Sequence, residues 1–168
     1  MTLKKLRKRL AAEADKAGIC REWREKILTA PSREFLLTLF IKGLDFAILN
    51  NFPSDELAAE FADIAPHYGI FINQAISDSK PHKTTIARNA AGKVTVNRWS
   101  VGEVYALRGS EVEIEATGHA CLYVTIEAGA KVRVTARHWA KVRILQHGGE
   151  VQTEAHDNAQ INNLLNKN

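Results

Sequence analysis

The 168-residue sequence predicts an α+β protein in which a helical N-terminal part precedes a repetitive β part. Two observations support this prediction. Apolar residues recur at helical spacing up to about residue 65, whereas beyond residue 84 they alternate with polar residues in units of ten. We therefore expect a helical domain at 1–67 and a repetitive β domain at 84–157, joined by a linker with a short strand at 68–83 and followed by a tail at 158–168.

Two helices are predicted first. Leucines at i, i+3 and i+7 define the first helix, which ends at Gly18, and Ile19, Trp23 and Ile27 share one face of the second.

Two further helices complete a predicted four-helix bundle. The third begins at Pro31-Ser32 and runs to Leu49, and its wide apolar stripe is typical of the central helix of a bundle. The fourth begins after Pro53, with Ser54 as its N-cap, and ends at Pro66.

The β domain is predicted from an internal repeat of ten residues. Its consensus is Ala-x-Val-x-Val-x-Ala followed by about three turn residues, and segments 110–116, 120–126, 130–136 and 140–146 align without gaps. Alternation directs one aliphatic row toward a common core. That row contains Val112, Ile114, Leu122, Val124, Ile126, Val132, Val134, Val142 and Ile144.

A fixed unit of ten is compatible with a short β-solenoid or β-roll, or with an antiparallel β-meander or sandwich. In a solenoid with two strands per coil, residues twenty apart lie over one another. Glu111 would then lie beside Lys131 and Glu113 beside Arg133, so both pairs are complementary. This complementarity favours the solenoid. The tail at 158–168, which contains five asparagines, is expected to be frayed or to form a short helix.

Positive charge is concentrated at the N-terminus. Residues 1–28 contain nine Lys or Arg against four Asp or Glu, within a net charge of +4 for the whole chain. Five of these basic residues are candidates for contacts with nucleic acid or another anion: Lys4, Lys5, Arg7, Lys8 and Arg9.

Aromatic residues of the repeat are candidates for surface recognition. Trp99 and Trp139 occupy the same position of the ten-residue frame, so a solenoid places them at one corner, where they could form a patch with Tyr123 or Tyr105. Four histidines fall at or near repeat turns, so two or three of them could cluster along one edge of the stack: His119, His138, His147 and His156. Because their frame positions differ, we assign no metal ligands.

Catalytic and membrane functions find no support in the sequence. It contains no phosphate-binding glycine loop and no hydrolase or kinase motif, so we predict a non-enzyme without a cofactor. Cys20 and Cys121 form no metal or disulfide pattern, which together with the absence of a secretory signal predicts a cytoplasmic protein. The most apolar stretch, 35–49, is broken by charges and too short to span a bilayer.

The layout resembles a family of small uncharacterised bacterial proteins, some carried by prophages, with a helical N-terminal part and a repetitive β C-terminal part. The resemblance lies in Asn50-Asn51-Phe52-Pro53-Ser54, Tyr68-Gly69-Ile70-Phe71, the Ser100–Tyr105 segment and His147-Gly148-Gly149. It implies no activity. A weaker similarity is to bactofilin-like polymerising β-helices.

These observations favour a structural or protein-interaction module that forms a homo-oligomer through its β domain, and the resemblance implies an association with prophages. A nucleic-acid-associated protein that uses the basic N-terminal helix is the second hypothesis. A carbohydrate- or metal-binding module at the β-turn corner is the third.

Overall fold

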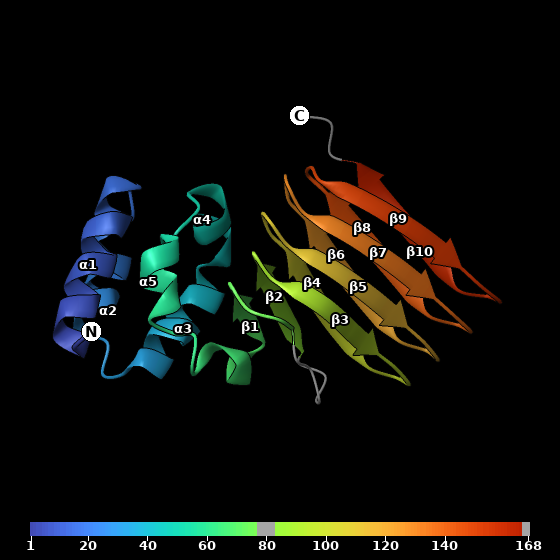
Figure 1. Ribbon diagram of the computed structural model, residues 1–168, viewed down its shortest axis with the longest axis horizontal. Helices are drawn as coiled ribbons and strands as arrows, with labels where there is room; N and C mark the ends of the chain where they lie inside the picture. The colour runs from blue at the N-terminus through green and yellow to red at the C-terminus, as the bar shows by residue number, and fades with distance from the viewer. Residues whose placement is uncertain (77–82, 166–168) are drawn as a thin grey trace. The chain divides into compact units, whose positions relative to one another are not determined.

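The computed structural model describes residues 1–76 and 83–165. The chain divides into two compact units, Met1–Ala65 and Pro66–Asn168. Helices form the first unit and parallel strands dominate the second, so the mixed α+β class is confirmed (Figure 1).

The helical unit contains five α-helices in its described residues, not the predicted four. They are α1 (Leu3–Lys16), α2 (Arg21–Thr29), α3 (Arg33–Lys42), α4 (Leu44–Leu49) and α5 (Asp55–Ala59). The predicted third helix breaks at Gly43, which forms the C-cap of α3. Glycine is a poor helix former, and a Cβ at Gly43 would lie 3.4 Å from the Trp23 ring.

The predicted fourth helix is also corrected. α5 ends at Ala59 instead of reaching Pro66, and the short 3₁₀ helix η1 follows at Ala65–Tyr68. Ser54 stands at the N-cap position, but its hydroxyl makes no cap bond and instead donates to Glu13 Oε2 at 2.8 Å. The N-cap interaction is thus replaced by a contact between α1 and the start of α5. Within residues 1–76 and 83–165, no helix is both long and apolar enough to cross a membrane.

The β unit consists of two parallel sheets. One contains β1 (Ile70–Ile72), β2 (Thr84–Arg88), β4 (Val101–Ala106), β6 (Cys121–Ile126), β8 (Lys141–Gln146) and β10 (Gln160–Leu165) in that order. The other contains β3 (Ala91–Val96), β5 (Glu111–Ala116), β7 (Lys131–Ala136) and β9 (Glu150–Ala155). We call the six-stranded sheet A and the four-stranded sheet B.

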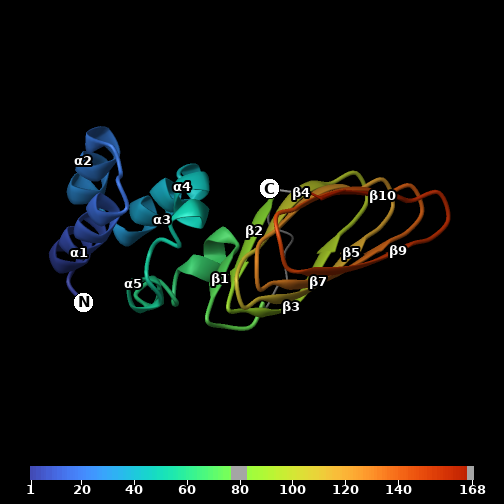
Figure 2. The ribbon, with the colours of Figure 1, turned by 90° about the horizontal axis from the view of Figure 1, so that it is seen from above.

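From β2 to β10 the strands alternate between the sheets, so each coil contributes one strand to each. Figure 2 shows the coils as flattened rings, with β4 and β10 of sheet A on one side and β3, β5, β7 and β9 of sheet B on the other. Val101 pairs with Cys121 and Glu111 with Lys131, and both pairs are parallel and twenty residues apart. The parallel register confirms the solenoid and excludes the antiparallel meander or sandwich.

The predicted aliphatic row forms the solenoid core. All nine of its residues are buried, and Ile114, Leu122, Ile126, Val134 and Ile144 are completely inaccessible to solvent. Alternation along six-residue strands thus builds a continuous apolar interior between the sheets.

The predicted tail is a strand, which corrects the expectation of a frayed end or short helix. Gln160 N donates to Ala140 O at 2.9 Å, and β10 continues in register with β8. Ile161 packs against the core, which helps to explain why this asparagine-rich segment is ordered. Residues 166–168 of the tail lie outside the described residues, as do 77–82 of the linker.

Candidate functional site

One corner of the solenoid stacks equivalent turn residues along the coil axis. His119 N donates to Arg98 O, Trp139 N to Gly118 O and Asn158 N to His138 O, at 2.7 to 2.9 Å. The repeated backbone bond places Trp99, His119, Trp139 and Asn158 at the same position of successive turns. Three of these four positions carry rings, and we call Trp99, His119 and Trp139 the aromatic ladder.

The rings of the ladder are nearly parallel. Trp99 and His119 stack with centroids 3.9 Å apart and an interplanar angle of 2°, and His119 and Trp139 follow at 6.3 Å and 4°. Trp99 is 79% exposed and Trp139 56% exposed. The predicted shared corner of the two tryptophans is confirmed, but the ring between them is His119 and not Tyr123 or Tyr105.

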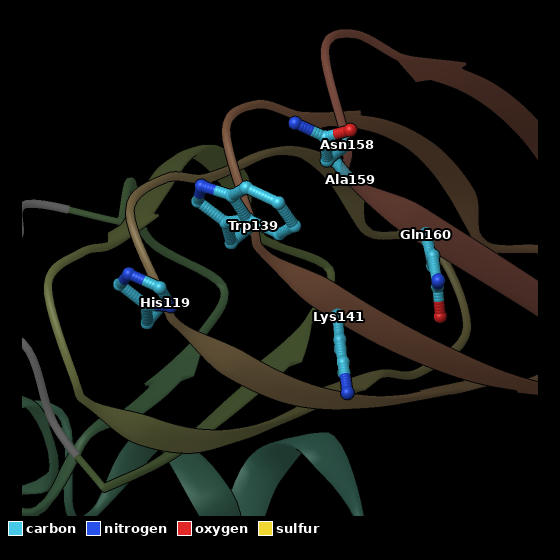
Figure 3. Close-up of a pocket in the computed structure, with 6 residues that line it drawn as sticks. All are labelled: His119, Trp139, Lys141, Asn158, Ala159 and Gln160. Carbon is cyan, nitrogen blue, oxygen red and sulfur yellow. The ribbon is translucent and has the colours of Figure 1, made fainter.

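A hollow of about 510 Å³ opens beside Trp139. Its lining consists of His119, Trp139, Lys141, Asn158, Ala159 and Gln160. Figure 3 shows the Trp139 ring between His119 and Asn158, with the Lys141 and Gln160 side chains extending from neighbouring strands. The volume is within the usual range for small-ligand sites.

Two cations of β8, Lys141 and Arg143, lie on the outer face of sheet A, and Lys141 also lines the hollow. Lys141 is in register with Cys121 and Gln160, and Arg143 with Tyr123 and Asn162. Neither cation has a carboxylate among its register partners, and neither forms an ion pair within the part of the chain that the structure describes. Tyr123, predicted to serve in recognition, is 45% exposed on this face.

The outer face of sheet B is different because its cations are matched by carboxylates. Lys131 Nζ lies 3.8 Å from Glu111 Oε1, and Arg133 pairs with Glu154 at 2.8 Å. Lys93 Nζ lies 2.7 Å from Glu115 Oε2, and its hydrogen bond is the main cause that lowers the pKa of Glu115. The three cations of sheet B thus each have a carboxylate partner, whereas sheet A is basic near the ladder.

The five predicted N-terminal basic residues divide into two groups. Arg7 Nη1 donates to Ala30 O at 2.9 Å, and Arg9 forms a bidentate pair with Glu56 at 2.8 Å. Lys4, Lys5 and Lys8 are exposed on α1. The first group supports the helical unit itself, and the second remains accessible to an anion.

The turn histidines do not assemble into a metal centre. His119 lies within the ladder, whereas His147 lies 3.6 Å from Glu127 at the opposite corner. His138 Nδ1 accepts from Gly118 N, and His156 lies 3.8 Å from Glu154. Across residues 1–76 and 83–165, no three His, Cys, Asp or Glu residues come together in a metal-binding group.

The last coil forms a second surface of interest, which we call the open end and define as the outer edges of β9 and β10. In the described residues β9 pairs only with β7 and β10 only with β8. Since Gln160 N bonds toward β8 and backbone direction alternates along a strand, the amides of Ile161, Asn163 and Leu165 point outward. Leu165 is 63% exposed there and Leu164 46%.

Comparison with family models, curated proteins and solved structures finds no match to this chain. The resemblance to prophage-carried proteins therefore stays a prediction.

Proposed function

We propose that this protein is a non-enzymatic interaction module that forms a homo-oligomer through the open end of its solenoid. The observation that supports the proposal is the uncharged edge strand β10, whose sequence is QINNLL. Exposed strand edges in natural proteins usually carry charges, proline or a bulge that prevent further pairing. β10 carries no charged residue and no proline, and it exposes Leu164 and Leu165 instead.

The backbone at the open end is suited to strand addition. The outward amides of Ile161, Asn163 and Leu165 are spaced at every second residue, as an added strand requires. The inward side chains of the same three residues continue the core row, but no further coil covers them in the described residues. A second copy would therefore satisfy backbone hydrogen bonds and bury apolar surface in one contact.

Charge favours one arrangement of the two copies. β9 carries Glu150 and Glu154 on its outer face, whereas β10 carries no charged residue. Pairing β9 with β10 of a second copy keeps the glutamates apart, while pairing β9 with itself brings like charges together. In a two-fold arrangement, β9 of each copy pairs with β10 of the other copy. All four edges are then paired, so the assembly closes as a dimer.

Size-exclusion chromatography with light scattering tests the proposal. The full chain is expected to elute at a multiple of its 18.7 kDa mass. Asn163→Pro removes an outward amide without removing a bond to β8, and it is expected to give a monomer. Asn163→Ala is the matched control, because it loses the Asn163–Gln146 side-chain bond but keeps the amide, and it should remain oligomeric.

A second variant tests the same contact without a proline, so the proposal can be tested even if the proline variant misfolds. Leu165→Lys places a charge in the exposed end of the core row and is expected to give a monomer. Leu49→Lys makes the same change on an 84% exposed leucine of α4 and should leave the mass unchanged. A wild-type chain that is monomeric at every concentration, or a folded Leu165→Lys variant that keeps the wild-type mass, overturns the proposal.

A further inference from the structure

The aromatic ladder stops one turn before the end of the solenoid. Asn158 occupies the turn position that carries Trp139, His119 and Trp99 in the preceding coils. The hollow lies at this point, with Trp139 on one side and Asn158 on the other (Figure 3). A flat ring entering the hollow can stack on Trp139 and continue the ladder, as His119 does on Trp99 at 3.9 Å.

Hydrogen-bonding groups surround the place that such a ring would take. Asn158 and Gln160 offer amide donors and acceptors, and Lys141 offers an ammonium group. These groups suit a ring with polar atoms on its edge, such as a nucleobase. A plain hydrocarbon ring would leave them without partners.

The adjacent charge indicates an anionic ligand. Lys141 and Arg143 lie two residues apart on the same face of β8, and their register partners in sheet A are uncharged. By contrast, Lys131 and Arg133 on sheet B have carboxylate partners within 3.8 Å. Within the part of the chain that the structure describes, Lys141 and Arg143 thus have no carboxylate partner, and they lie on β8, which directly follows the Trp139 turn of the ladder.

We propose that this surface, made of Trp139, its hollow and the cations of β8, binds single-stranded nucleic acid. A base stacks on Trp139, and the neighbouring phosphates bind Lys141 and Arg143. Single-stranded nucleic acid presents unpaired base faces together with a charged backbone, so it matches both features of the surface. A neutral saccharide matches the ring alone and leaves the two cations unpaired.

Fluorescence anisotropy with a labelled oligothymidylate tests the inference on the full chain. We expect binding that weakens as salt rises, and much weaker binding of duplex DNA because its bases are already stacked. Trp139→Ala is expected to weaken binding by about 5- to 150-fold, the range that loss of one base–aromatic stack gives. Trp139→Phe, which keeps a ring, is expected to recover part of the affinity.

Charge variants separate this surface from the other basic regions. The double variant Lys141→Gln/Arg143→Gln should weaken binding and lower the slope of log affinity against log salt by about 1.4. Lys131→Gln/Arg133→Gln makes the same change on sheet B and should have little effect. The triple variant of Lys4, Lys5 and Lys8 to Gln tests the α1 surface and should also leave most of the affinity.

Several outcomes would overturn the inference. The wild-type chain could fail to bind oligothymidylate, or the sheet B double variant could lose as much affinity as the sheet A variant. Loss of binding in the α1 triple variant alone would assign the contact to the helical unit. Equal binding of a polyuronate would show that the surface recognises charge without stacking a base. The monomeric Leu165→Lys variant is expected to bind, so that failure of assembly and failure of nucleic-acid binding are distinguished.

Discussion

Glu111 and Lys131 are twenty residues apart in the sequence and directly paired in the parallel strands β5 and β7, with Lys131 Nζ 3.8 Å from Glu111 Oε1. The pair shows how one coil of the solenoid equals two ten-residue units. Glu150 lies on the other side of Lys131, so one lysine separates two glutamates along the outer face of sheet B.

Reversal of this charge is expected to destabilise the solenoid. Lys131→Glu places three carboxylates in adjacent rungs, and like charges at paired positions cost about 0.2–1 kcal/mol each. Urea denaturation should show a lower midpoint, and the double variant Glu111→Lys/Lys131→Glu should recover part of the loss. An unchanged midpoint for the single variant would argue against the register.

Two neighbouring residues of β8 should differ sharply in their contribution to stability. Ile144 is completely buried, whereas Leu145 points to the other face and is 38% exposed. Ile144→Ala is expected to lower the free energy of unfolding by about 2–5 kcal/mol, and Leu145→Ala by less than about 1 kcal/mol. Equal losses, measured by chemical denaturation, would contradict the assigned inward and outward faces.

Two glycines of one corner should respond differently to alanine. Gly129 and Gly149 both have a left-handed backbone, with φ of +80° and +71°. A Cβ at Gly149 would lie 2.5 Å from Ala130 O, whereas the nearest atom to a Cβ at Gly129 is a side-chain carbon of Arg108 at 3.4 Å. Gly149→Ala should therefore lower the thermal midpoint more than Gly129→Ala. The Gly129 variant is destabilised only by its left-handed backbone conformation, which costs an alanine about 1–2 kcal/mol. The reverse order would contradict the tight turn.

Acid should weaken the Lys93–Glu115 pair. Lys93 donates a hydrogen bond to Glu115 and lowers the pKa of that carboxyl below its ordinary value of 4.5. The contribution to stability is therefore present above about pH 4.5 and is lost as pH falls through the lower pKa of the folded state. Urea midpoints measured from neutral to acid pH should fall more steeply for the wild type than for Glu115→Gln. Identical slopes would exclude a contribution from this pair.

Much of the solenoid could be predicted because one short repeat determines it. Alternation within each unit identifies the buried row, and complementary charges twenty residues apart identify the parallel register. The frame also places Trp99 and Trp139 at one corner. His119 lies twenty residues from each, so the same count identifies it as the middle ring of the ladder.

The remaining differences have local causes. The turn His147–Gly149 is one residue shorter than Glu127–Ala130, so the spacing between coils falls from twenty to nineteen. A fixed frame of ten residues therefore does not predict β10. Ile161 follows its partner Val142 by nineteen residues, the same shortened spacing. The break at Gly43 depends on packing against Trp23, which periodicity within one helix does not reveal.

Hydrogen exchange along β10 tests the proposed assembly most directly. At high protein concentration, we expect slow exchange for the outward amides of Ile161, Asn163 and Leu165, because a second copy covers them. On dilution these three amides should become fast, while those of Gln160, Asn162 and Leu164, bonded to β8, stay slow. Fast exchange of the three outward amides at every concentration would contradict the proposal.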